Sequence, residues 1–167
     1  MYELMKLHAD AIPEALRMIE RYRLLNEPRE AESICHDVLA TDPSNDKALI
    51  GLLLSLTDQF DMGDATGPAK RAQSILPRLA TDYERAYYAG IIHERMAKAR
   101  LKRGGPRSSF VAHEELTEAM ECFEAAEKIR PPANDDAILR WNACARLIMS
   151  RDDIRHEPEE QIHYTLE

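Results

Sequence analysis

Apolar residues recur at intervals of three and four along most of the chain, which is the spacing of one face of an α-helix. The clearest stripe is Leu49, Leu52, Leu53 and Leu56. Runs of β-branched residues that alternate with polar residues, which would predict strands, are nearly absent. We therefore expect an all-α protein. Prolines and glycines divide the pattern into separate helices. The first covers about 13–25, and the second runs from the break at 26–28 to about 40. The others cover about 46–58, 65–79, 82–102, 113–129 and 135–150.

The breaks between the expected helices are spaced regularly, since Pro43 and Pro77 lie 34 residues apart. Small or apolar residues precede each proline at intervals of four, three and five. This spacing occurs in three segments: Ala31, Cys35, Val38 and Pro43; Ala65, Ala69, Ala72 and Pro77; and Ala119, Phe123, Ala126 and Pro131. Alanines allow paired helices to approach closely, and a proline ends the second helix. Three copies of one pattern indicate stacked helix–turn–helix units.

This pattern resembles the tetratricopeptide repeat (TPR) family. The resemblance implies a right-handed α-α superhelix of about three helix pairs plus a C-terminal helix. Its units would cover 12–45, 46–79 and 80–133, with a final helix at 134–150 that completes a domain over 1–150 and a charged tail at 151–167. Other helical-hairpin repeats have periods that fit less well. The Trp and Leu-Gly of the family's first helix are mostly replaced, and Ala69 occupies a bulky aromatic position. Pro131 follows Pro77 by 54 residues, so twenty extra residues lengthen the third unit around 86–109.

In this family the first helix of each unit lines a concave surface that holds a peptide or partner helix. The resemblance therefore implies a protein-binding adaptor. Its carried-over groove positions are Leu16, Glu20, Arg23, Leu24, Lys47, Ile50, Leu54, Asp58, Tyr87, Ile91, Glu94, Arg95, Ile138, Asn142 and Arg146. Some members clamp a C-terminal carboxylate with Lys, Asn and Arg. Leu16 and Glu20 stand where the first cation and amide of that clamp belong, so we do not expect that activity.

Charge placement supports a second candidate function. The formal net charge of −8 argues against general binding to nucleic acid or anionic membrane. Residues 95–113 nevertheless contain six cations and no acid, and this segment would suit an acidic, phosphorylated or nucleic-acid partner. The same cations would also favour a helix C-terminus, or pair with acids in the tail. The basic patch is Arg95, Lys98, Arg100, Lys102, Arg103 and Arg107, and the tail acids are Asp152, Asp153, Glu157, Glu159, Glu160 and Glu167.

The last expected helix is apolar on two faces, whereas the end of a solenoid is normally capped by a polar surface. One stripe is Ala137, Ile138, Trp141, Cys144 and Ile148, and the other is Leu139, Ala143 and Leu147. We expect either the tail, through Ile154, Ile162 and Tyr164, or a second copy of the chain to cover the latter stripe. A homodimer through the last helix is therefore possible.

Catalytic and metal motifs are weak, so we expect neither an enzyme nor a bound cofactor or metal. His93-Glu94 and His113-Glu114 begin like zinc-protease motifs, but no histidine follows at the required spacing. Cys122 near His113 is the one nucleophile-and-base combination. All three cysteines, Cys35, Cys122 and Cys144, lie at expected core positions. The N-terminus has no signal-peptide pattern, and the longest apolar run, 48–56, is too short to cross a bilayer. We expect a cytoplasmic protein without membrane contact.

Overall fold

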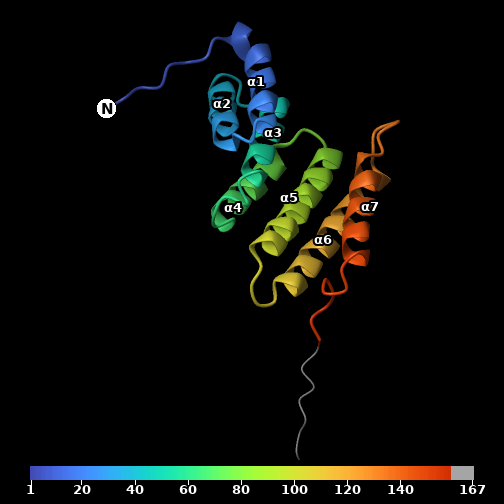
Figure 1. Ribbon diagram of the computed structural model, residues 1–167. Helices are drawn as coiled ribbons and strands as arrows, with labels where there is room; N and C mark the ends of the chain where they lie inside the picture. The colour runs from blue at the N-terminus through green and yellow to red at the C-terminus, as the bar shows by residue number, and fades with distance from the viewer. Residues whose placement is uncertain (159–167) are drawn as a thin grey trace, which may run out of the picture.

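Residues 1–158, which the computed structural model describes, fold into α-helices joined by short turns, with no strand among them (Figure 1). This confirms the all-α prediction. The helices are α1 (Ile12–Leu24), α2 (Pro28–Thr41), α3 (Asp46–Thr57), α4 (Thr66–Ile75), α5 (Asp82–Arg103), α6 (Ser108–Lys128) and α7 (Asp136–Met149). Short 3-10 helices precede α1 at Ala9–Ala11 and follow α4 at Leu76–Arg78.

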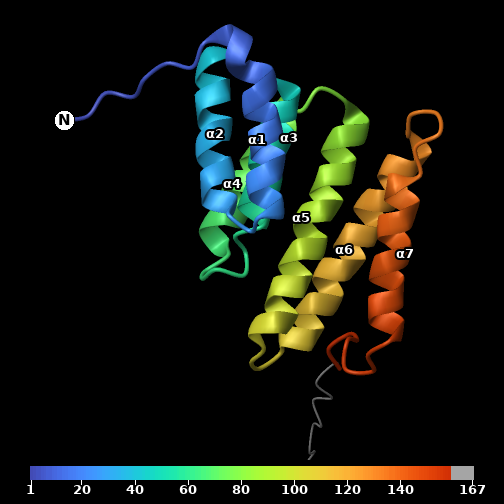
Figure 2. The same ribbon diagram turned by 45° about the horizontal axis from the view of Figure 1, so that its top comes forward.

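Consecutive helices pack side by side as hairpins. α1 packs on α2, α3 on α4, and α5 on α6, while α7 lies against α6 at the end of the row (Figures 1 and 2). Helix α5 has 22 residues and α6 has 21, whereas α1 and α2 have 13 and 14. Most of the twenty extra residues of the third unit therefore lengthen both helices of one hairpin.

The helix ends follow from capping residues in the sequence. Asn26 adopts a left-handed φ of 58°, and the Glu27 amide then donates to the Tyr22 carbonyl at 2.9 Å, which closes α1. The Asn45 side chain accepts a hydrogen bond from the Ala48 amide at 3.0 Å, which caps α3. Thr81 and Glu84 form a reciprocal capping box at the start of α5. These local interactions place the breaks between helices close to where the sequence predicts them.

The repeated small and apolar residues lie in the core. Ala31, Cys35 and Val38 of α2, Ala72 of α4, and Ala119, Phe123 and Ala126 of α6 are all fully buried. The second helix of each hairpin therefore buries the face that the spacing of its alanines predicts. Cys144 is buried as well, but Cys122 is only half-buried, so its assignment to the core was wrong.

Two helix boundaries differ from the prediction. Helix α4 ends at Ile75, and Leu76–Arg78 form a 3-10 turn, because Pro77 cannot donate the hydrogen bond that would continue the α-helix. Helix α6 begins at Ser108, five residues before the predicted start at His113. Gly104 and Gly105 take positive φ values and end α5, and Arg107 is left-handed with a φ of 61°. The turn is complete at Arg107, which leaves the next residue free to begin a helix.

The segment after α7 packs back on the turn between α5 and α6. Ile154 is buried in the core shared by α5, α6 and α7. Arg107 forms an ion pair with Glu157, and the Ser109 hydroxyl donates to Asp153 at 2.6 Å. One of the expected pairings between tail acids and the basic segment is therefore present. Other expected tail contacts involve residues outside those described, namely Glu159, Glu160, Ile162, Tyr164 and Glu167.

The outer face of α7 stays partly exposed. Leu139, from the second apolar stripe, is 64% exposed, and Ile138 is 37% exposed. Ala137 and Cys144 face inward and are buried. The described part of the tail covers the end of the α5–α6 hairpin through Ile154, and Leu139 remains uncovered by it.

Candidate partner-binding groove

Two neighbouring cavities lie on the side of the molecule formed by α1, α3, α5 and α7, the first helices of the successive hairpins. One has a volume of about 230 Å³ and is mainly apolar, and the other has a volume of about 360 Å³ and is mainly charged. Arg23 of α1 lines both of them. The two cavities therefore adjoin at Arg23, the apolar one between α1 and α3 and the charged one extending to α5 and α7, and together they are called the groove below.

The apolar cavity lies between α1 and α3. A Cβ atom at Gly51 would meet Ile19 Cγ2 at 3.0 Å and Cys35 Sγ at 3.4 Å, so glycine permits the close approach of these helices. Leu16 and Leu54 are half-buried there and offer apolar surface to a ligand. The lining residues are Leu16, Ile19, Glu20, Arg23, Lys47, Ile50, Gly51 and Leu54.

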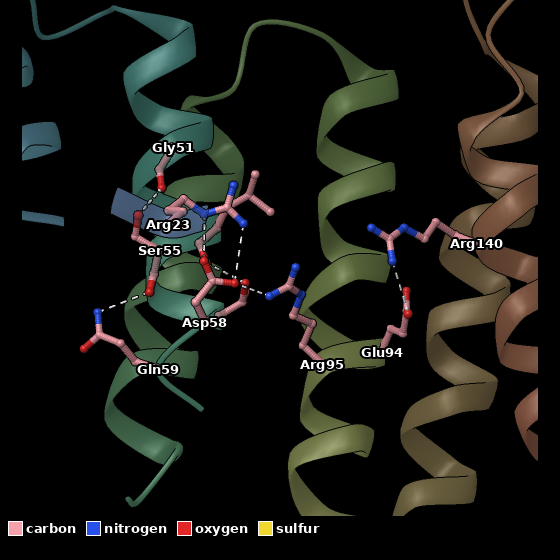
Figure 3. A network of polar contacts seen from close by, with 10 residues as sticks. Arg23, Gly51, Ser55, Asp58, Gln59, Glu94, Arg95 and Arg140 are labelled. Atoms are coloured by element: carbon pink, nitrogen blue, oxygen red, sulfur yellow. Dashed lines mark hydrogen bonds and ion pairs between the residues drawn. The ribbon is translucent and has the colours of Figure 1, made fainter. Parts of the chain in front are cut away.

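The charged cavity is built around Asp58, which directly follows α3. Arg23 Nε donates to Asp58 Oδ2 at 2.7 Å, and Arg95 of α5 donates to the other carboxylate oxygen (Figure 3). The Asp58 side chain is only 17% exposed. Because it accepts bonds from two different helices, it links the first two hairpins to the third. The cavity lining is Arg23, Asn26, Thr57, Asp58, Phe60, Asp61, Arg95, Lys98 and Arg140.

A buried carboxylate lies beneath this cavity. Glu94 of α5 is 1% exposed, and its Oε1 atom accepts from Lys98 Nζ and, at 3.4 Å, from Arg140 of α7 (Figure 3). Among the described residues, no hydrogen-bond partner reaches Glu94 Oε2. A buried carboxylate is stable only when it is paired, so Glu94 determines where Lys98 and Arg140 lie.

Buried polar residues at the end of α3 keep Asp58 in place. The Ser55 hydroxyl donates to the Gly51 carbonyl at 2.7 Å, and the Gln59 amide donates to the Ser55 carbonyl at 3.2 Å (Figure 3). Gln59 also donates to Glu32 of α2 at 2.6 Å. These bonds satisfy polar groups that would otherwise be buried without partners, and they attach the end of α3 to the helix behind it.

The predicted groove residues fall into three groups. Those of α1 and α3 other than Leu24, together with Asp58 and Arg95, line the two cavities. Leu24 and Ile138, which are 88% and 37% exposed, line neither cavity. Ile91 was assigned wrongly, because it is 1% exposed and packs in the core. The remaining residues do not line either cavity: Glu94 lies below the charged one, Tyr87 stacks at 5.7 Å on Tyr83, and Asn142 and Arg146 lie elsewhere on α7.

Two residues that line the charged cavity were not predicted as groove residues: Arg140 was not singled out, and Lys98 was assigned only to the basic patch. The sequence does contain an indirect signal, since Glu94 stands between apolar residues of a predicted helix and a buried acid requires a cation. A partner 46 residues away on another helix can be identified only from the tertiary arrangement.

Most cations of the predicted basic patch contact groups of this chain. Arg95 and Lys98 bind Asp58 and Glu94 as described. Lys102 Nζ donates to Asp61 at 2.7 Å, and Arg103 donates to the Gly63 carbonyl at 2.6 Å. Arg107 pairs with Glu157. Arg100 is the exception, because it is exposed and has no hydrogen bond or ion pair with the described residues. The segment therefore fastens the loop after α3 and the start of the tail to the long hairpin.

The histidine that begins one motif, His93, pairs with α6. Its Nδ1 lies 2.8 Å from Glu115 Oε2. The hydrogen bond that His93 donates to the Glu115 carboxylate raises the pKa of His93 above its ordinary value, although burial opposes the shift. The stabilisation from this pair is therefore fully present below about pH 6.5, the ordinary value, and is lost as the pH rises through the higher pKa of the folded protein.

We expect Glu115→Gln to lower the pKa of His93 and to weaken this pH dependence, because the carboxylate that favours the imidazolium is removed. An NMR titration of the histidine ring signals measures the shift. Glu114→Gln, at an exposed neighbouring position, is the matched control and should leave the His93 signal unchanged. A His93 pKa that is the same in wild type and Glu115→Gln would contradict the assignment.

The cysteines and the other histidine motif do not come together. Burial raises the pKa of the Cys35 and Cys144 thiols to about 12, and burial also raises the pKa of Cys122. Cys122 and His113 both lie on α6, nine residues apart, which separates them by about 14 Å along the helix. The His113 ring instead lies 4.8 Å from the ring of His156. Cys122 and His113 therefore do not form a nucleophile and base.

Within residues 1–158, no cluster of three or more His, Cys, Asp or Glu side chains is arranged to hold a metal ion. In the same part of the chain, no helix combines the length and the apolar character needed to cross a membrane.

Comparison of the chain with protein-family models, curated proteins and solved structures found no match.

Proposed function

We propose that this chain is a TPR-like repeat protein, coiled as a right-handed superhelix, that binds a peptide or helix of another protein in the groove described above. The observation that carries the proposal is the lining of both cavities by α1, α3, α5 and α7 and the turns that directly follow α1 and α3. The helices between them pack behind this surface. A solenoid presents an extended concave surface of this kind for binding.

The chemistry of the groove supports a polypeptide ligand. Half-buried Leu16, Ile50 and Leu54 offer apolar surface, and charged side chains lie directly beside them. Binding sites for amphipathic helices and extended peptides combine these two features. The basic segment is not proposed as a separate nucleic-acid site, because the chain has a net charge of −8, Arg95 and Lys98 belong to the groove, and Lys102, Arg103 and Arg107 bind the loop after α3 and the tail. A cytoplasmic location stays a prediction.

The test is a selection of random peptides of about 12 residues, which extend to about 40 Å, displayed on phage against the immobilised full chain. We expect enriched peptides to bind wild type and to lose binding when Leu54→Arg or Glu20→Trp blocks the groove. Glu20 is exposed, so its replacement keeps the fold even where Leu54→Arg does not.

The matched control is Ile129→Arg, because Ile129 is exposed and lies outside both cavities. Circular dichroism verifies that each variant is folded. A selection that enriches no peptide, or peptides that bind the Glu20→Trp variant as well as wild type, would overturn the proposal.

A further inference from the structure

We infer that the segment bound in this groove is acidic and amphipathic: its carboxylates contact Arg23, Arg95, Lys98 and Arg140, and its apolar side chains enter the cavity between α1 and α3. The inference rests on the proposed function and specifies its partner. The observations that support it are an excess of cations in the charged cavity, N–H donors left free on those cations, and the apolar cavity alongside.

Cations outnumber carboxylates in the charged cavity, although the chain as a whole is acidic with a net charge of −8. Its lining contains four cations and only two carboxylates, Asp58 and Asp61. Asp61 binds Lys102, which lies outside the lining. Glu94 adds a third carboxylate beneath the cavity, so the four lining cations exceed the three carboxylates by one even when Asp61 is counted among them. An anionic ligand would complete the charge balance of this site.

The two carboxylates at the centre are shared, so donors remain free. Asp58 serves both Arg23 and Arg95, and Glu94 serves both Lys98 and Arg140. A guanidinium has five N–H donors. Bonds among the described residues occupy two of these donors on Arg23 and one on Arg95. The remaining donors suit a carboxylate, because the planar fork of a guanidinium matches its two oxygens.

These cations are held in position before a ligand arrives. Figure 3 shows Arg23 and Arg95 converging on Asp58 from opposite sides, with the Glu94–Arg140 pair beyond them. The side chains of Arg23 and Arg95 are 21% and 30% exposed, so part of each remains accessible. A side chain that is already ordered loses little conformational entropy on binding. The site is therefore suited to direct contact with carboxylates, in addition to long-range electrostatic attraction.

The adjoining apolar cavity favours an acidic peptide over a nucleic acid. Arg23 lines both cavities, so a ligand that reaches the cations also passes over Leu16, Ile50 and Leu54. A phosphate backbone has nothing to place against these residues, whereas a peptide with a leucine or isoleucine near its acids does. The net charge of −8 also repels a long polyanion more strongly than a peptide with a few carboxylates.

The test uses the peptides enriched in the selection described above. We expect them to combine Asp or Glu with large apolar residues, and we expect Arg95→Gln to weaken their binding by at least tenfold, because a charge-assisted contact with the ligand is lost. Asp58 keeps Arg23 as its partner in this variant, so the fold is retained. Fluorescence anisotropy of labelled peptides measures the affinity.

Lys70→Gln is the matched control, because Lys70 is exposed on α4 and its replacement removes the same charge outside the groove. Binding to this variant should stay within about twofold of wild type, since charges beyond a Debye length of ~8 Å are largely screened. Enriched peptides that are neutral or basic, or that bind Arg95→Gln and wild type equally while Glu20→Trp blocks them, would overturn this inference and leave the proposed function standing. A selection without enrichment would instead overturn the proposed function.

Discussion

Replacing Phe123 by alanine is expected to lower the free energy of unfolding by about 3–5 kcal/mol, the range for removing a buried aromatic ring. Phe123 is fully buried in the core of the α5–α6 hairpin, and its ring centroid lies 5.8 Å from that of Tyr87. The cavity left behind would be surrounded by helices that cannot collapse into it without separating other contacts. Urea unfolding followed by circular dichroism measures the change.

A substitution at Gly90 of α5 tests the packing of the Phe123 ring directly. A Cβ atom at Gly90 would lie 2.5 Å from Cε1 of Phe123, which is too close for any packed pair of carbons. We therefore expect Gly90→Ala to cost about 1–3 kcal/mol by overpacking. In the Phe123→Ala background the ring is absent, and the same substitution should stabilise the helix by up to about 1 kcal/mol, because alanine is the better helix former.

The matched control is Gly67→Ala in α4, where an added Cβ would meet nothing within 4 Å. Pro68 follows Gly67 and disfavours a Cβ on the helical residue before it, so we expect this variant to lose some stability, by the same amount in both backgrounds because the added Cβ does not contact Phe123. If Gly90→Ala has the same sign of effect with and without Phe123, the close packing of the ring on the glycine is wrong.

Removing both cations from Glu94 is expected to have the second large effect. The double variant Lys98→Ala/Arg140→Ala would leave a carboxylate that is 1% exposed without a partner for its charge. Breaking a buried ion pair from one side costs about 3–5 kcal/mol. Lys98 and Arg140 are themselves partly exposed, and water would enter where they are truncated, so we expect about 3 kcal/mol, the lower end of that range.

A third substitution tests whether the unpaired charge of Glu94, and not the loss of two surface side chains, causes the destabilisation. Adding Glu94→Gln to the double variant removes the unpaired charge and should restore part of the lost stability in urea unfolding. The matched control is Arg100→Ala/Lys102→Ala, two exposed residues of the same helix, whose loss should change stability by less than about 1 kcal/mol. An additional loss of stability on adding Glu94→Gln would show that the charge of Glu94 is not what the cations compensate.

The positions of the helices could be predicted because their causes are local. Pro28, Pro43 and Pro77 mark helix breaks regardless of what surrounds them, since proline lacks an amide donor. The alanines of α2 and α6 recur at helical spacing, and this periodicity is sufficient to identify the face that Ala31 and Ala119 bury. Helix ends were less certain. The start of α6 depends on the left-handed residue Arg107, and arginine carries no clear signal for that conformation.

Most groove residues of the first two hairpins could be predicted from the sequence, whereas only Arg95 of the residues predicted on the third hairpin lines a cavity. Leu16 and Leu54 line the apolar cavity as the repeat spacing suggested. Ile91 does not line the groove, because the longer α5 and α6 pack extensively on each other and bury the face that carries it. A groove position carried over from the repeat assumes that the helices of every hairpin have the same length, whereas α5 and α6 of the third hairpin are longer.

The helical character of this chain, most of its helix breaks and the small residues buried between paired helices follow from the amino-acid sequence alone, because those properties arise within a few turns of one segment. The pairing of Asp58 with Arg23 and Arg95, and of Glu94 with Arg140, follows only from the way the helices pack. These partners lie 35 to 46 residues apart in the chain. Their meeting depends on how far each hairpin is shifted and rotated against the next, and helical periodicity specifies a face of a helix but not the side chain that a neighbouring helix brings to it.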